Sequence, residues 1–108
     1  MSAAPDDPDP IRIAFETEVI EWRGPAPFFY APAPPDVAAE LRAVMRAVTY
    51  GWGMIPVEAQ ANGVAFTTAL FPKDDTYLLP LKAAVRRQAA ITAGDHVAVQ
   101  LTLAARRG

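Results

Sequence analysis

The residues best suited to bind a ligand are three cations and one tryptophan. Lys82 and Arg86 are four positions apart, so on a helix they share one face. Lys73 stands in the segment that precedes them, and Trp52 lies between two glycines, where its ring can lie flat at the mouth of a barrel. Together these side chains could hold an anion or a carboxylate beside an aromatic wall, and Arg86 is the strongest single candidate.

A structural reading of the same residues stays open. Trp52 could plug the end of the barrel, and Lys73 and Lys82 could belong to a solvated face. The planar guanidinium of Arg86 can also bond the last carbonyls of a crossing strand, which would make it structural. The candidate ligand-binding residues are therefore Arg86, Lys82, Trp52 and Lys73, and the ligand, a small molecule or a protein, is unknown.

Enzyme chemistry has little support in the sequence. There is no cysteine, and the one serine, Ser2, is near the N-terminus, far from the one histidine, His96. A Ser–His or Cys–His nucleophile pair is thus not expected. We expect His96 to be solvated at the start of a strand, and Asp74 and Asp75 to cap a turn. Metal-ligand spacings and phosphate loops are missing from the sequence, so we predict a non-enzymatic protein without catalytic residues, metal or cofactor.

The charge balance disfavours nucleic acid as a partner. Twelve acidic and ten basic residues give a formal net charge of −2, which lacks the basic excess of nucleic-acid-binding domains. A local basic surface of Arg86, Arg87, Arg106 and Arg107 would escape this test. The third possibility is a protein-interaction module in which the acidic face of one half docks on the basic face of another copy. Both a monomer and a homodimer stay open.

Size and composition predict one domain in the cytoplasm. A chain of 108 residues without cysteine can bury one core and has no disulfide framework. No apolar run approaches the roughly 20 residues of a membrane-spanning helix, and we expect no association with a membrane. We predict a disordered, acidic, proline-rich tail at residues 1–10 and a single β-barrel domain at 11–105.

The stretch 78–103 has the clearest pattern of elements. Apolar residues end at Pro80, which cannot donate to a strand ladder, and Lys82–Ala90 is rich in good helix formers. Gly94 supplies a tight reversal, and His96–Leu103 then alternates strictly between apolar and polar residues. We therefore predict a strand, a short helix, a turn and a half-buried strand.

The first part of the chain predicts strands and one longer helix. Residues 11–19 alternate with a period of two, but Ile20 and Trp22 fall on the opposite face, so a bulge or strong bend is expected there. A short aromatic strand at 28–30 leads to a helix that begins near Pro34–Asp36. One apolar stripe at helical spacing faces the core: Val37, Leu41, Val44, Met45 and Val48.

A hairpin lies near the middle of the chain. Alternating residues at 55–61 precede Asn62–Gly63, the dipeptide favoured in two-residue hairpin loops, and residues 64–71 return. We expect a polar loop at 71–76 after the returning strand.

The halves of the chain before and after this hairpin show the same order of predicted strands and helix. Residues 34–40 can be laid on 80–86, an offset of 46, and each half then has the order β-β-α-β. This predicts a mainly β fold with a pseudo-two-fold repeat, in which two half-barrels share one core and two short helices act as caps. Chance similarity between alanine-rich helices is the alternative.

Several motifs also resemble known families. The segment Leu79–Arg86, followed by Gly94–Asp95 and an alternating strand, resembles the swapped-hairpin proteins of the AbrB/MazE type. More closely, residues 15–103 resemble the bacterial family catalogued as domain of unknown function nineteen-oh-five. That likeness rests on the combination of the Pro-Asp helix start, Gly-Trp-Gly, Ile-Pro-Val and Tyr-Leu-Leu-Pro. The resemblance implies a small double-split β-barrel and no established activity, and the AbrB likeness adds a DNA-binding regulator as an alternative function.

Overall fold

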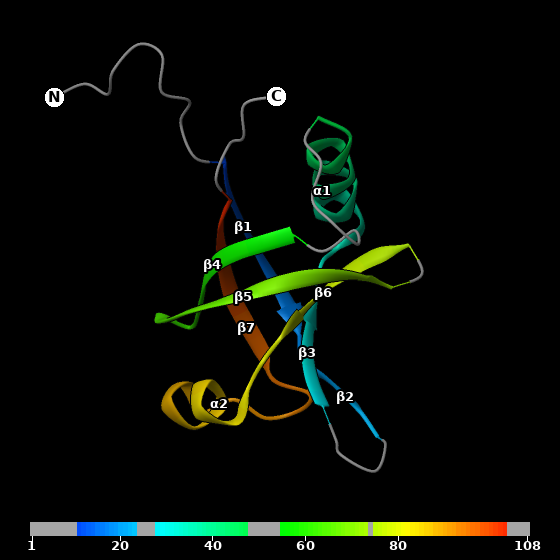
Figure 1. Ribbon diagram of the computed structural model, residues 1–108. Coiled ribbons are helices and arrows are strands. Elements are labelled where there is room, and N and C mark those ends of the chain that lie inside the picture. The colour runs from blue at the N-terminus through cyan, green and yellow to red at the C-terminus, as the bar shows by residue number, and fades with distance from the viewer. Residues whose placement is uncertain (1–10, 24–27, 48–54, 74, 104–108) are drawn as a thin grey trace, which may run out of the picture.

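The computed structural model describes residues 11–23, 28–47, 55–73 and 75–103 (Figure 1). The elements along the chain are β1 (Ile11–Glu18), β2 (Ile20–Trp22), β3 (Phe28–Pro32), α1 (Pro35–Ala47), β4 (Ile55–Ala61), β5 (Val64–Lys73), β6 (Thr76–Pro80), α2 (Ala83–Ala89) and β7 (His96–Leu103).

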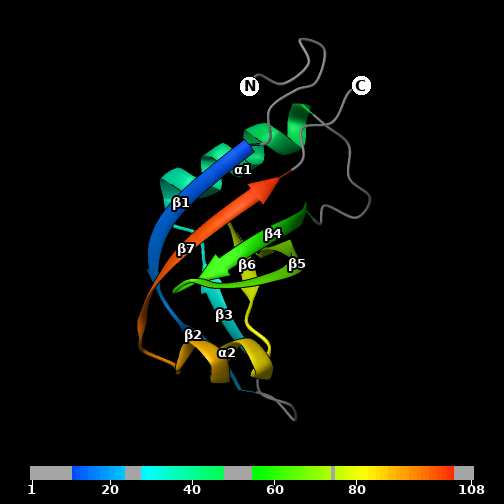
Figure 2. The ribbon, with the colours of Figure 1, turned by 90° about the vertical axis from the view of Figure 1, so that its left-hand side faces the viewer.

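The strands form one antiparallel sheet of seven strands, in the order β1-β7-β4-β5-β6-β3-β2. The sheet curls into a half-barrel, with α1 and α2 near opposite ends (Figures 1 and 2). Strand β5 joins the two parts of the sheet, because its residues 64–70 pair with β4 and its residues 71–73 pair with β6. The predicted mainly β fold with two helices is confirmed.

A break at Val19 separates β1 from β2, at the position where the sequence predicts a bend. Val19 is buried, its N–H donates to the carbonyl of Asp95 at 2.8 Å, and its carbonyl accepts the N–H of Gly94 at 2.8 Å. The turn before β7 therefore holds this corner in place. The predicted break is present, but it does not turn the apolar residues of β2 inward, because Ile20 and Trp22 are 42% and 46% exposed.

The hairpin at Asn62–Gly63 is also confirmed. Both residues have positive φ, 49° and 86°, as the two central positions of a type I′ turn require. The turn is fastened to β7, because the N–H of Asn62 donates to the carbonyl of Ala98 and the N–H of Ala98 donates to Oδ1 of Asn62, both at 2.9 Å. The hairpin and β7 thus support each other.

The polar loop predicted at 71–76 is wrong. Strand β5 continues to Lys73 and β6 begins at Thr76, so the two strands form a tight hairpin. Pro72 is tolerated inside β5 because this end of the strand pairs only with β6, which leaves its other edge without a ladder to interrupt.

The core is formed by the buried residues of the strands together with residues of both helices. From α1 it takes Val37, Ala38 and Leu41, and from α2 it takes Val85. The predicted strand β7 contributes its apolar positions Val97, Val99, Leu101 and Leu103, all fully or almost fully buried.

The C-terminal end of α2 could not be predicted from the sequence. Ala90 follows the last turn with φ 56°, a left-handed conformation that favours glycine. The predicted reversal at Gly94 is present, with φ 89°. The carboxylate of Asp95, which follows Gly94, accepts the N–H of Thr92 at 2.9 Å and stabilises the turn into β7.

Candidate functional site

A groove lies where β3 begins, β6 ends and α2 starts. Its volume is about 350 Å³. We call it the α2 groove, and it is lined by Phe28, Phe29, Pro80, Leu81, Lys82, Ala83 and Arg86. The lining combines two aromatic rings, an aliphatic wall and two cations, and it includes no acidic residue.

The local backbone explains why Lys82 stands at the mouth of this groove. Leu81 is buried and its N–H donates to the carbonyl of Phe29 at 2.9 Å, which anchors the chain as it leaves β6. Lys82 then adopts φ −70° and ψ 160°, an extended conformation just before α2, and its side chain makes no capping hydrogen bond. The backbone therefore places the exposed side chain of Lys82 at the start of the helix.

Arg86 is held on the floor of the groove by two contacts. Its Nε donates to the carbonyl of Leu81 at 3.1 Å, and its guanidinium carbon lies 3.8 Å from the centre of the Phe29 ring. The bond is local, to the residue that follows β6, and not to a crossing strand as in the structural reading. The terminal NH₂ groups of Arg86, however, donate to no acceptor among the described residues. A tethered guanidinium with unused donors is suited to bind a carboxylate or another oxyanion.

The other two predicted site residues do not line this groove. Lys73 lies at the end of β5, where its Nζ is 4.3 Å from the centre of the Trp22 ring, a cation–π contact. Trp52 lies outside the described residues. Of the four candidates, the structure brings Lys82 and Arg86 together.

An exposed aromatic surface adjoins the groove at Phe28 and was not predicted as a site. Trp22 and Phe28 are cross-strand partners, and they are 46% and 56% exposed. The ring of Tyr30 stacks on Phe28 at 6.3 Å between ring centres and meets Phe71 edge-on at 5.3 Å. The sequence signal was the outward phase of β2, but the pairing with β3 that assembles the surface is visible only in the structure.

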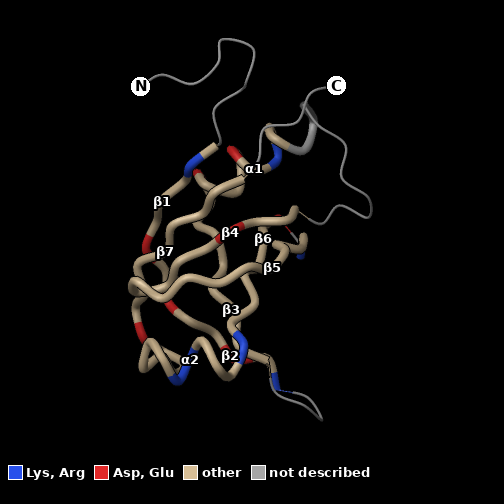
Figure 3. The backbone as a smooth tube through the Cα atoms, turned by 60° about the vertical axis from the view of Figure 1, so that its left-hand side comes forward, with Lys and Arg blue, Asp and Glu red and all other residues tan. Residues whose placement is uncertain are grey.

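Basic positions gather at the same end of the molecule. Figure 3 shows Lys and Arg on α2 and at its start. Lys82 and Arg87 are exposed and Arg86 is half-buried. Lys82, Arg86 and Arg87 therefore form a local basic cluster beside the α2 groove, although the whole chain has a net charge of −2.

Family comparison identifies the kind of domain. A family model described as Domain of unknown function (DUF1905) matches residues 15–101. The chain belongs to the DUF1905 family. The comparison with curated proteins finds no match. Phe28, Phe29, Lys82 and Arg86 all lie within the part of the DUF1905 domain that the family model covers.

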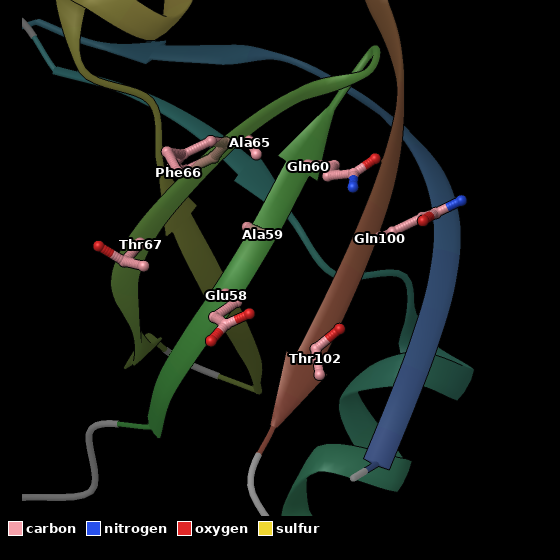
Figure 4. A pocket seen from close by; sticks show the side chains of 8 residues that line it. All are labelled: Glu58, Ala59, Gln60, Ala65, Phe66, Thr67, Gln100 and Thr102. Carbon is pink, nitrogen blue, oxygen red and sulfur yellow. The ribbon is translucent and has the colours of Figure 1, made fainter. Parts of the chain in front are cut away.

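A second depression of this DUF1905 domain lies on the outer face of the sheet, over β4, β5 and β7 (Figure 4). Its volume is about 390 Å³. Cross-strand pairing places Gln60 opposite Gln100 and Glu58 opposite Thr102. The described side chains that line this depression make no hydrogen bonds to one another, and they offer two amides, two hydroxyls and one carboxylate but neither a cation nor a nucleophile–base pair. We therefore treat the α2 groove as the candidate site.

Two further features of the DUF1905 domain concern metals and membranes. Within residues 11–23, 28–47, 55–73 and 75–103, the structure has no group of His, Asp and Glu side chains that could hold a metal ion. Neither of the helices in these ranges has the length and apolar character needed to cross a bilayer.

Proposed function

We propose that this DUF1905 domain is a non-enzymatic binding module for a small carboxylated molecule with an apolar body. The observation that carries the proposal is the composition of the α2 groove, in which Lys82 and Arg86 face the same space as Phe28 and Phe29. A carboxylate would bond the cations, and the apolar body would lie against the rings.

The contacts of Arg86 supply preorganisation. Its bond to Leu81 and its position against Phe29 hold the guanidinium in place before a ligand arrives, so less side-chain entropy is lost on binding. Lys82 adds a flexible point charge at the exposed side of the groove. We therefore expect Arg86 to orient the carboxylate and Lys82 to increase the affinity.

A thermal-shift comparison of charged and neutral probes tests this function. Benzoate and benzamide have the same ring and nearly the same shape, but only benzoate carries a carboxylate. We expect benzoate to raise the melting temperature of the wild type, and benzamide to raise it much less. Lys82→Gln should weaken the benzoate effect, whereas the matched control Arg87→Gln, on α2 but outside the groove, should keep it. Equal effects of both probes, or an unchanged benzoate effect in Lys82→Gln, would contradict the proposal.

We also propose that the half-barrel is a double-split β-barrel built from two β-β-α-β halves. Two pairs of backbone hydrogen bonds support this repeat. The bond from Ala33 N–H to Tyr77 O and the bond from Leu81 N–H to Phe29 O exchange their places if residue numbers shift by 48, and both are 2.9 Å long. The first bonds of the helices obey the same shift: Ala38 N–H donates to Pro34 O at 2.8 Å, and Arg86 N–H donates to Lys82 O at 3.0 Å.

The shift of 48 differs from the 46 that aligns Pro34 with Pro80 in the sequence. It places Lys82 opposite Pro34 and Arg86 opposite Ala38, which is 1% exposed. The repeat thus pairs a small, buried alanine in the first half with Arg86 in the second half. The first half lacks the cation, so the repeat predicts a single groove. An experimental structure in which 29–38 and 77–86 do not superpose about a two-fold axis would refute the repeat and leave the ligand proposal untouched.

A further inference from the structure

Strand β1 forms one end of the sheet, and its outer hydrogen-bonding edge has no partner in the part of the chain that the structure describes. Among the described residues, β1 pairs with β7 alone. It lies at the outer margin of the sheet, beyond β7 (Figures 2 and 4). An edge strand of this length is a template for pairing with another chain.

The groups exposed at this edge can be derived from the β7 pairing. Ala98 points its N–H and carbonyl toward Asn62, on the β4 side of β7. Because successive residues of an antiparallel strand point these groups to opposite sides, Val97, Val99 and Leu101 bond with β1 through its odd-numbered residues. The N–H and carbonyl groups of Arg12, Ala14, Glu16 and Glu18 therefore point to the free edge.

In one register, the side chains along this edge form two opposite-charge pairs without bringing two carboxylates together. If two β1 strands pair antiparallel with Ala14 opposite Ala14 of a second copy, Arg12 of each copy faces Glu16 of the other. On the core side, Ile13 then faces Phe15 of the second copy. The register with Arg12 opposite Ala14 has no charge pair. The register with Ala14 opposite Glu16 pairs Arg12 with Glu18, but it brings the two Glu16 carboxylates together diagonally.

We propose that two copies of the chain associate through the β1 edges in this register, which continues the sheet across a two-fold axis. The occupant of the edge is a second copy because the alternation of charge on β1 complements itself. The opposite edge of the same part of the sheet, the outer edge of β5 from Val64 to Leu70, carries no charged side chain and offers Arg12 and Glu16 no partner. The proposal does not depend on the α2 groove, which lies on different elements.

Site-specific cross-linking tests the register. The chain has no cysteine, so each introduced cysteine is unique. Ala14 and Ala65 are both exposed and stand at the two ends of one row of cross-strand partners, through Gln100 and Gln60. With a short bismaleimide, Ala14→Cys should give a covalent dimer in high yield, and Ala65→Cys should give little. Equal yields from the two variants, or none from either, would overturn the proposal.

Charge reversal supplies an independent readout by analytical ultracentrifugation. Arg12→Glu and Glu16→Arg each turn both symmetry-related pairs into repulsions, and each should weaken the dimer about tenfold or more. The double variant R12E/E16R restores opposite charges in the same register and should recover the wild-type affinity. A wild-type chain that stays monomeric at about millimolar concentration, or a double variant as weak as the single ones, would overturn the proposal.

Discussion

Removal of the Arg86 side chain should destabilise the fold by about 2 kcal/mol. Replacement by alanine deletes the bond from Nε to the carbonyl of Leu81, a buried residue, at a cost of about 1–2 kcal/mol. It also deletes the contact with the Phe29 ring at 3.8 Å, which adds about 0.5–1 kcal/mol at a partly exposed site. Arg86→Lys keeps the charge but cannot make both contacts at once, so its loss should be about half as large.

Urea denaturation followed by circular dichroism measures these differences. The matched control is Arg87→Ala, an exposed neighbour on the same helix, which should change the free energy of unfolding by no more than about 0.5 kcal/mol. In thermal unfolding, a loss of 2 kcal/mol corresponds to a decrease in Tm of roughly 8–16 °C for a domain near this size. If Arg86→Ala unfolds within error of Arg87→Ala, the two contacts do not hold the guanidinium in place, and the argument from preorganisation fails.

Three other substitutions test the packing and the turns, all by urea denaturation. Leu101→Ala, at a fully buried position of β7, should cost about 2–5 kcal/mol, and a loss below 1 kcal/mol would show that Leu101 is not packed as described. Gly63→Ala places a side chain at φ 86° and should cost about 1 kcal/mol, so an unchanged stability would argue against the type I′ turn. Ala90→Gly relieves a φ of 56° and should stabilise the protein by up to about 1 kcal/mol, whereas a clear loss would contradict the left-handed end of α2.

The sequence predicted those elements whose pattern is local. The strict alternation of His96–Leu103 specifies both a strand and its buried face, and Asn62–Gly63 specifies a hairpin because both residues tolerate positive φ. The end of β5 was missed because Pro72 and Lys73 are typical of loops. Only the pairing with β6 shows that this part of β5 is an edge where proline is tolerated.

The candidate site was predicted only in part, because only some of its residues have a local sequence pattern. The spacing of Lys82 and Arg86 along one helix face is local and brought both to attention. Phe29 and Leu81 join the site through the register of β3 with β6, which connects segments far apart in the chain and leaves no local signal. Lys73 was separated from the site because its long side chain reaches Trp22, a contact that depends on the twist of the sheet.

The measurement that tests the central claim most directly is a titration of ¹⁵N-labelled protein with benzoate, followed by two-dimensional NMR. We expect saturable shifts at the backbone amides of residues 28–29 and 81–86 and at the Nε–H of Arg86, and smaller shifts at the same site in Lys82→Gln at equal ligand concentration. Saturable shifts centred on Glu58, Gln60 and Gln100 of the outer sheet face, or no saturable shift at all, would contradict it.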